Sequence, residues 1–381
     1  MKGWVALVVA TSTVIGFTYA GHASIAPLIA SEMGLDDVQL GMLSAALFLG
    51  AALPVVIAGD VADRAPKAAN TLALALVLAG NVGFALAPTY ELLLVARVVG
   101  GVGAGFGLLA GLRYISRRYG DARSHFAYGL YGAGFPLGSA IALWIMPLLA
   151  APGGWRGAFW ATSAAMLTIT LLWQRARQVP PVERRGSMRD AAGCPNCWLT
   201  ALQHAAGFGL VLAAGSWIAI YILREFSLPL ELSGFLGSLL LFLAMVSRPV
   251  GGFLVARERV RTLTVMRSAQ LLVLVGLALL ALPGRPLAAA LAGALAVGFG
   301  GGIPYAAVFN TASASFPRAP GAAQGITAVG GLVSTLLGAP AMGYAIQTWG
   351  FSAAWGILAL ISVAALAATF VMRGEEELAL G

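Results

Sequence analysis

Length, composition and charge narrow the class of protein at once. The chain has 381 residues, of which 59% are hydrophobic and only 10% are charged, whereas about 25% are charged in a soluble domain. A water-soluble globule is therefore excluded. The net charge of +8 does not indicate a nucleic-acid binder, because the basic residues stand in short clusters between long apolar runs. At about 20 residues per crossing, the chain can hold roughly twelve membrane spans.

Twelve apolar segments of spanning length follow one another along the chain. A helical structure is expected throughout, because backbone polar groups must be satisfied inside a bilayer, and a membrane barrel would show alternating strands of about ten residues instead. The first segment follows Lys2 and could pass for a signal peptide, but the many spans behind it favour a retained helix. The predicted spans lie at about 4–31, 38–58, 70–88, 91–113, 124–150, 155–173, 199–223, 230–254, 262–282, 286–315, 321–347 and 351–372.

The distribution of Lys and Arg predicts the orientation of these spans. With the N-terminus inside, only Arg156, Arg224 and Arg285 fall in outer loops, while Arg97 and Arg248 fall within or at the end of spans. The remaining 18 of the 23 basic residues then lie on the cytoplasmic side, as the positive-inside rule requires. We therefore predict a multi-pass protein of the bacterial inner membrane with both termini in the cytoplasm.

One long polar connection, 174–198, divides the spans six and six. It contains Pro180 and Pro181 and suggests a division into residues 1–173, a cytoplasmic linker at 174–198 and residues 199–381. The halves also resemble each other, since 129–134 matches 325–330 and 154–160 matches 350–355, both at an offset near 196. Repeated six-helix halves are typical of alternating-access transporters, whose substrate site lies near the bilayer midplane.

The loop after the second span carries a family signature. Its sequence, Gly59-Asp60-Val61-Ala62-Asp63-Arg64-Ala65-Pro66-Lys67, resembles the G-x-L-A-D-R-x-G-R-K motif of the major facilitator superfamily, and the resemblance covers the whole chain. It implies an all-α fold of twelve helices in two pseudo-symmetric bundles. It also implies that this loop forms a cytoplasmic latch, a cluster of charged contacts that holds the two bundles together in one conformation. The alternative is that the loop is a solvated turn whose charges only mark the cytoplasmic end of the span. The latch candidates are Gly59, Asp63, Arg64 and Lys67, with Gly252 and Arg257 at the matching place in the second half.

Two arginines within the spans are candidates for a site. Arg97 begins a segment similar to the family's R-x-x-Q-G-x-G-A pattern, and a guanidinium inside a bundle is a functional candidate by default. The alternative is that Arg97 snorkels to the outer interface near Glu91.

The fifth span partly resembles the family's antiporter motif. The residues that carry this resemblance are Gly132, Gly134, Pro136 and Gly138, and helix packing explains them more simply.

Arg248 belongs to a second resemblance. The segments 207–209, 248–252, 298–302 and 324–331 look like the nitrate/nitrite porter and cyanate-permease branch of the superfamily, in which an Arg of the eighth span binds substrate. The second Arg of that branch would fall at Val55 here. The resemblance therefore implies a different small anion, held by one planar guanidinium. The alternative assigns Arg248 to the cytoplasmic latch.

Carboxylates are missing from the middle of the spans, so the usual acidic proton relay is missing too. His22, between Tyr19 and Ser24, is the remaining titratable candidate, although a packing role is the alternative. The candidates for substrate binding are Arg97, Arg248, His22, Tyr131, Tyr221, Tyr305 and Asn310.

These patterns predict a secondary transporter for a small organic or inorganic anion, which acts as a monomer and needs no cofactor. No G-x-x-x-x-G-K-[ST] motif is present, so a proton or a counter-solute would supply the driving force. Cys194 and Cys197 form a CxxC pair, and a structural zinc site would need two more ligands. Because His204, seven residues on, lies inside the next apolar run, the pair is expected to stay as two cytoplasmic thiols, with a metal or redox role as the alternative. The alternatives are efflux of an amphipathic compound and a non-transporting sensor or assembly protein. The spans lack a catalytic constellation, so an enzyme is not expected.

Overall fold

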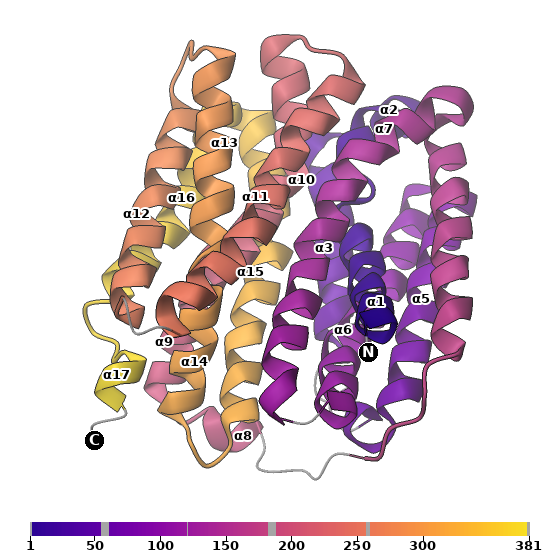
Figure 1. Cartoon of the computed structure of the whole chain (residues 1–381). Helices are drawn as coiled ribbons and strands as arrows, with labels where there is room; N and C mark the ends of the chain where they lie inside the picture. The colour runs from indigo at the N-terminus through magenta and orange to yellow at the C-terminus, as the bar shows by residue number, and fades with distance from the viewer. Residues whose placement is uncertain (1, 55–60, 120, 182–187, 257–259, 379–381) are drawn as a thin grey trace.

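The protein is a bundle of long helices. A computed structural model describes residues 2–54, 61–119, 121–181, 188–256 and 260–378, and within these ranges its regular structure is helical (Figure 1). Ten helical stretches are long and apolar enough to cross a membrane. One of them, Leu130–Gln174, is broken at Gly153 and Gly154 and so holds two crossings, and the shorter apolar helix Asp37–Ala52 supplies another. The predicted all-α fold of twelve spans is confirmed.

The first six crossings form the N-terminal bundle, drawn from indigo to magenta in Figure 1. Its elements are α1 (Lys2–Ala20), the 3-10 turn η1 (Ala23–Ile25), α2 (Ala26–Met33), α3 (Asp37–Ala52), α5 (Pro66–Leu86), α6 (Tyr90–Tyr119) and α7 (Asp121–Gln174).

The remaining crossings form the C-terminal bundle beside it. Its elements are α8 (Met188–Ala191), α9 (Pro195–His204), the π-helix η2 (Ala205–Gly209), α10 (Leu210–Phe226), α11 (Leu230–Ala256), α12 (Thr262–Ala281), α13 (Leu287–Gly302), α14 (Tyr305–Ser315), α15 (Pro320–Trp349), α16 (Phe351–Ala368) and α17 (Glu375–Leu378). We call the end that carries α8 and α17, at the bottom of Figure 1, the linker end, and the opposite end, which carries α2, the far end. Asp37 begins α3 shortly after α2, and Arg224 lies against Asp37 at the same end.

Local sequence signals account for where several helices begin. Asp36 and Gln39 form a capping box at the start of α3, each side chain bonding the other's backbone N–H, which satisfies donors that the first helical turn leaves free. Pro66, Pro195 and Pro320 occupy the first turns of α5, α9 and α15, where the missing N–H of proline costs nothing. Because α9 begins at Pro195, its first residues belong to the stretch 174–198 that the sequence assigns to the linker.

Glycine brings helices into backbone contact, as in other membrane bundles. Between the bundles, a Cβ on Gly41 of α3 would stand 2.7 Å from the carbonyl oxygen of Ala339 on α15, and one on Gly234 of α11 would stand 2.5 Å from that of Leu143 on α7. Helices α3 and α15, and likewise α7 and α11, therefore form the seam between the bundles.

The internal repeat is visible in the backbone. Gly154 has φ of 64° and ψ of −176°, and Gly350 has φ of 84° and ψ of 177°. This left-handed extended conformation is accessible essentially only to glycine. The two glycines stand at equivalent joints, between the fifth and sixth crossings and between the eleventh and twelfth. The residues that directly follow them, Trp155 and Phe351, are both aromatic and buried.

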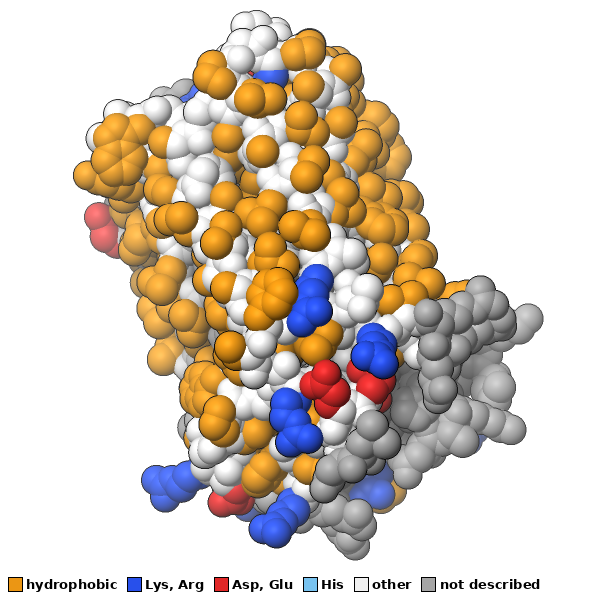
Figure 2. Space-filling model, turned by 90° about the vertical axis from the view of Figure 1, so that its left-hand side faces the viewer, with side chains coloured by type: hydrophobic (Ala, Val, Ile, Leu, Met, Phe, Trp, Pro, Cys, Tyr) orange, Lys and Arg blue, Asp and Glu red, His pale blue; other side chains and the backbone are white. Residues whose placement is uncertain are grey.

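The outer surface suits a bilayer. Figure 2 shows hydrophobic side chains over most of the face it presents, with the Lys, Arg, Asp and Glu side chains gathered mainly in the lower part. Leu337, Leu360 and Val363 are examples of large apolar residues that are more than half exposed. Because lipid is as apolar as these side chains, such exposure has no cost in a membrane.

Three spans that the sequence predicts as continuous are interrupted in their middle. The first changes to the 3-10 turn η1, the seventh contains the π-helix η2, and the tenth breaks at Ile303 and Pro304 between α13 and α14. Each break lies inside a long, mainly apolar run, so a search for apolar runs of spanning length does not reveal it. Irregular backbone inside a membrane protein is tolerated only where protein or water covers it, and the three breaks surround the site described next.

Candidate functional site

Arg248 lies between the two bundles. It belongs to α11 and directly precedes Pro249, and its Nη1 donates a hydrogen bond of 2.6 Å to the carbonyl oxygen of Gly132 on α7. The structure therefore places this side chain at the seam between the bundles. The carbonyl is neutral, so the positive charge of Arg248 has no carboxylate partner among its hydrogen bonds and ion pairs in the described part of the chain.

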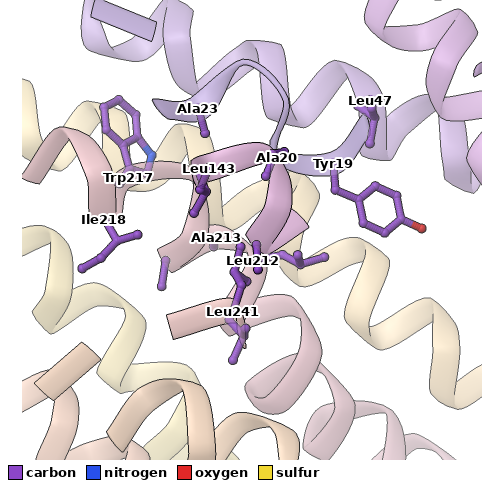
Figure 3. Packing of buried hydrophobic residues seen from close by; sticks show 14 of the residues in the cluster. Tyr19, Ala20, Ala23, Leu47, Leu143, Leu212, Ala213, Trp217, Ile218 and Leu241 are labelled. Atoms are coloured by element: carbon purple, nitrogen blue, oxygen red, sulfur yellow. The ribbon is translucent and has the colours of Figure 1, made fainter. Parts of the chain in front are cut away.

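Aromatic rings line the guanidinium of Arg248. Its Cζ lies 4.5 Å from the ring centroid of Tyr305 and 5.8 Å from that of Phe208. The ring of Tyr19, from the other bundle, meets Phe208 edge to face at 6.4 Å. Figure 3 shows Tyr19 turned away from the apolar residues labelled beside it. Cation–π contacts of this kind stabilise a cation without neutralising it.

Part of the guanidinium remains free to bind. The Nε atom of Arg248 is buried and has no hydrogen-bond partner among the described residues, although the side chain as a whole is partly accessible. A buried donor without a partner is costly and rare in native structures. An arginine presents its N–H groups in a planar fork that fits a carboxylate or a similar oxyanion, so the free Nε is a donor of the kind that such a ligand requires.

The broken spans converge on this group of residues. Tyr19 stands shortly before η1, Phe208 lies within η2, and Tyr305 is the first residue of α14. Pro249 removes a backbone donor from α11 just beside Arg248. Substrate sites of membrane transporters are typically formed by discontinuous helices near the midplane, and π-helical turns are frequent at functional sites.

Arg97 is placed differently from Arg248. Its Nε donates to the carbonyl oxygen of Leu43 at 2.9 Å, Nη1 to that of Thr18 at 2.7 Å and Nη2 to that of Tyr19 at 3.3 Å. The side chain is 4% exposed. All three nitrogens therefore hold backbone of α1 and α3, and the structure gives Arg97 a role in joining helices of the N-terminal bundle.

His22 lies on the far-end side of the same seam. Its Nε2 is 3.2 Å from Ser44 Oγ, which in turn is 3.1 Å from Ser216 Oγ of the C-terminal bundle. The Nδ1 atom is buried without a partner among the described residues. His22 thus belongs to a polar chain between the bundles, separate from the aromatic group around Arg248.

The predicted tyrosines are not all brought together. Tyr305 contacts Arg248, whereas Tyr131 is fully buried and donates to the carbonyl oxygen of Gly107 within its own bundle. Tyr221 packs against Phe351 and Trp355 and accepts a hydrogen bond from Arg285 towards the far end.

Asn310 is exposed and lies near the linker end. Burial raises the pKa of the Glu375 carboxyl, and a hydrogen bond with the Asn310 side chain opposes that shift. Asn310 therefore meets the C-terminal segment rather than Arg248.

The loop that resembles the family signature is held by an ion pair. Asp63 Oδ1 accepts a hydrogen bond of 2.6 Å from Arg113 Nε. A Cβ on Gly321, at the start of α15, would stand 4.0 Å from Arg113 Nη2, so the pair lies next to the other bundle. Lys67 donates to the carbonyl oxygen of Gln174 and Arg64 is exposed.

Of the remaining latch candidates, Gly252 lies on α11, where an added Cβ would stand 3.7 Å from Ala306. Gly59 and Arg257 lie outside the described residues, as does Val55.

Cys194 and Cys197 are free thiols at the start of α9. Cys194 contacts the carbonyl oxygen of Ser315 at 3.6 Å and Cys197 is buried. Within the described ranges, no group of three or more His, Cys, Asp and Glu is arranged to hold a metal ion.

An ion pair between the two bundles lies at the far end. Arg224 of α10 donates two hydrogen bonds of 2.8 Å to the two carboxylate oxygens of Asp37 at the start of α3. The sequence places both residues in outer loops but gives no sign that they meet, because their pairing depends on how the two bundles are set against each other.

Two bundles of six spans, with three broken spans beside a cation that has no carboxylate partner among the described residues, are the architecture of a membrane transporter. The chain belongs to the Major Facilitator Superfamily, whose family model matches residues 8–335. The fold and the relatives are those of transporters and not of enzymes.

Individual relatives agree with this assignment. A probable nitrate/nitrite antiporter of Thermus thermophilus is 28% identical over 359 residues, which cover 84% of this chain and 80% of that one. A probable sulfoacetate transporter of Cupriavidus necator is 27% identical over 66% of this chain and 64% of that one. The crystal structure of a bacterial homolog to the human lysosomal transporter Spinster, inward-facing and occupied, matches with a TM-score of 0.78 and 17% identity, covering 97% of this chain and 96% of that one. This last match concerns the fold alone.

Proposed function

We propose that this protein is a secondary transporter that moves a small anion across the membrane by alternating access. The observation that carries the proposal is Arg248, whose charge is held between the bundles without a carboxylate and whose Nε has no partner among the described residues. The names of two relatives support it, because nitrate, nitrite and sulfoacetate are all small anions. With Arg97 fully used by backbone carbonyls, one guanidinium binds the anion.

The orientation and the mechanism belong to the same proposal. The linker end, with both termini, faces the cytoplasm of a bacterial inner membrane, as the excess of basic residues in the short loops on that side favours. The units 1–173 and 199–381 move relative to each other, and the Asp63–Arg113 pair acts as the latch at the linker end. The protein works as a monomer, driven by a proton or a counter-solute.

Purified protein in liposomes provides the direct test. We expect saturable uptake of at least one of nitrate, methanesulfonate and sulfoacetate, because each presents an oxyanion to a planar guanidinium. The uptake should be abolished by Arg248→Ala. The aromatic rings around Arg248 favour one other candidate function, efflux of an amphipathic organic compound. Movement of a dye such as ethidium, without transport of any of the three anions, would replace our proposal with that function.

The pair of Asp37 and Arg224 predicts how the conformational equilibrium can be shifted. The pair must break before the bundles separate at the far end, so Asp37→Asn should favour the state that is open there. Because a partly exposed pair contributes up to about 1 kcal/mol, the shift should be roughly fivefold. This shift can be measured in a background in which Cys194 and Cys197 are replaced by Ser and Ser216 is replaced by Cys. The rate at which a membrane-impermeant maleimide labels this single cysteine reports how often the far end is open.

A matched control lies next to Arg224. Glu225 pairs with Arg285 at the same end but within the C-terminal bundle, so Glu225→Gln should leave the labelling rate unchanged. Equal labelling of the Asp37→Asn variant and its parent would show that this pair does not hold the bundles together.

A further inference from the structure

His204 is a buried imidazole that the mechanism above does not use. It is the last residue of α9, immediately before the π-helix η2, and is 7% exposed. Its ring lies nearly parallel to that of Phe208 at 5.1 Å, meets Phe309 edge to face at 5.0 Å and lies 6.1 Å from Tyr305. The imidazole is thus fixed by aromatic contacts on several sides.

The fold makes specific room for this ring. A Cβ on Gly331 of α15 would stand 2.7 Å from Cδ2 and 2.9 Å from Nε2 of His204. Any larger residue at 331 would therefore have to displace the imidazole. Gly331 is the last residue of the segment 324–331. The contacts of Arg248 do not account for the glycines of that segment.

His204 and Arg248 share the same aromatic cluster. Phe208 and Tyr305 are the two rings that the guanidinium of Arg248 faces, and both also lie beside His204. Arg248 is also the charged group whose electrostatic field reaches the imidazole. The proton-binding group and the anion-binding group are therefore close enough to influence each other.

The helices around His204 offer it no counter-charge. Helices α9, α13, α14, α15 and α16 and the turn η2 contain no Asp, Glu, Lys or Arg within their bounds. Tyr305 of α14 is the titratable group that faces the ring, Arg248 of α11 is the cation, and Arg224 and Glu225 of α10 lie at the far end. An imidazolium here would meet a guanidinium without any anion between them, which is electrostatically unfavourable at this depth.

We propose that His204 is a proton-binding site coupled to the anion at Arg248, so that one proton enters the site with each anion. The inference rests on the proposed anion transport and adds its coupling ion. A bound anion supplies the negative charge that the surrounding helices lack, so it stabilises the imidazolium. By reciprocity, protonation of His204 strengthens anion binding by the same factor. The imidazole takes the proton from water, and no covalent bond to the anion forms.

Linked binding of a proton and an anion can be measured in detergent-solubilised protein. The probes are nitrate, methanesulfonate and sulfoacetate, which stay ionised over the range from about pH 5 to about pH 8 in which an imidazole titrates. For a probe that binds, we expect the dissociation constant to rise about tenfold for each pH unit above neutrality. We also expect uptake of about one proton per bound anion, detected with a pH-indicator dye in weakly buffered solution.

Variants of the three histidines of the chain locate the proton. His204→Gln should still bind the anion, but with an affinity that no longer depends on pH and without proton uptake. His125→Gln is the matched control and should behave as the parent does. If proton uptake survives in His204→Gln and disappears in His22→Gln, the inference is wrong. The proton then binds to His22, next to Ser44 and Ser216.

Two further outcomes separate the inference from the function on which it rests. Anion binding that does not change with pH in the parent protein would remove the coupling and leave anion transport intact. If none of the three probes binds at any pH, the anion site itself is wrong, and the proton site falls with it.

Discussion

Replacing Arg248 by lysine should weaken anion binding by about tenfold to a hundredfold, the factor that corresponds to the loss of one charge-assisted hydrogen bond of about 1.5–3 kcal/mol. Lysine keeps the charge but loses the planar fork, and its ammonium cannot both bond Gly132 and offer a second donor in the direction of Nε. Arg248→Ala should abolish binding. Titration calorimetry of the purified variants with nitrate, methanesulfonate and sulfoacetate gives the dissociation constants.

Arg318 provides the control for this substitution, because it is exposed near the linker end. Arg318→Lys should bind the anions as the parent protein does. Should Arg248→Lys also bind with parental affinity, the guanidinium would serve only to tie α11 to α7, and the anion proposal would lose its main support.

Arg97→Met should lower the thermal stability of the protein without changing its affinity for the anion. The substitution removes the donors for the carbonyl groups of Leu43, Thr18 and Tyr19 from a buried position. Breaking a buried charged interaction on one side costs about 3–5 kcal/mol, so the thermal midpoint should fall by roughly 5–10 °C. Size-exclusion chromatography after heating measures the midpoint, and anion binding is then measured on the folded fraction.

Arg64→Met is the corresponding control, since Arg64 is exposed at the linker end, and its thermal midpoint should match that of the parent protein. A stable Arg97→Met variant that binds anions poorly would reverse our assignment and place Arg97 in the substrate site.

The crossings could be predicted from the sequence because each requires a long apolar run, and such runs do not depend on partners far along the chain. The breaks in the first, seventh and tenth spans could not be predicted in this way. The sequence of η2 is apolar, His22 and Ser24 at η1 also suit an ordinary packed helix, and Pro304 follows a run of glycines that suits close packing as well as a break. Only the path of the backbone separates these possibilities.

The same limit applies to the site. Arg248 could be singled out, because a charge within a span requires an explanation whatever its neighbours are. Tyr19, Phe208 and His204 could not be grouped with it, since their contacts join spans 1, 7, 8 and 10 and no local spacing encodes that arrangement. In the sequence, Tyr221 is a candidate by its polarity alone, and its contacts with Phe351 and Trp355 depend on how the helices are assembled.

The hydrogen bond from Arg248 to the carbonyl oxygen of Gly132 has a consequence for turnover if the proposed function holds. An anion that binds at the free Nε would leave this bond in place, and one that also draws on Nη1 would gain only the difference between its own bond and the one it displaces. The carbonyl of the opposite bundle would then compete with the cargo for the guanidinium. Such competition would favour release, which a carrier needs in order to turn over.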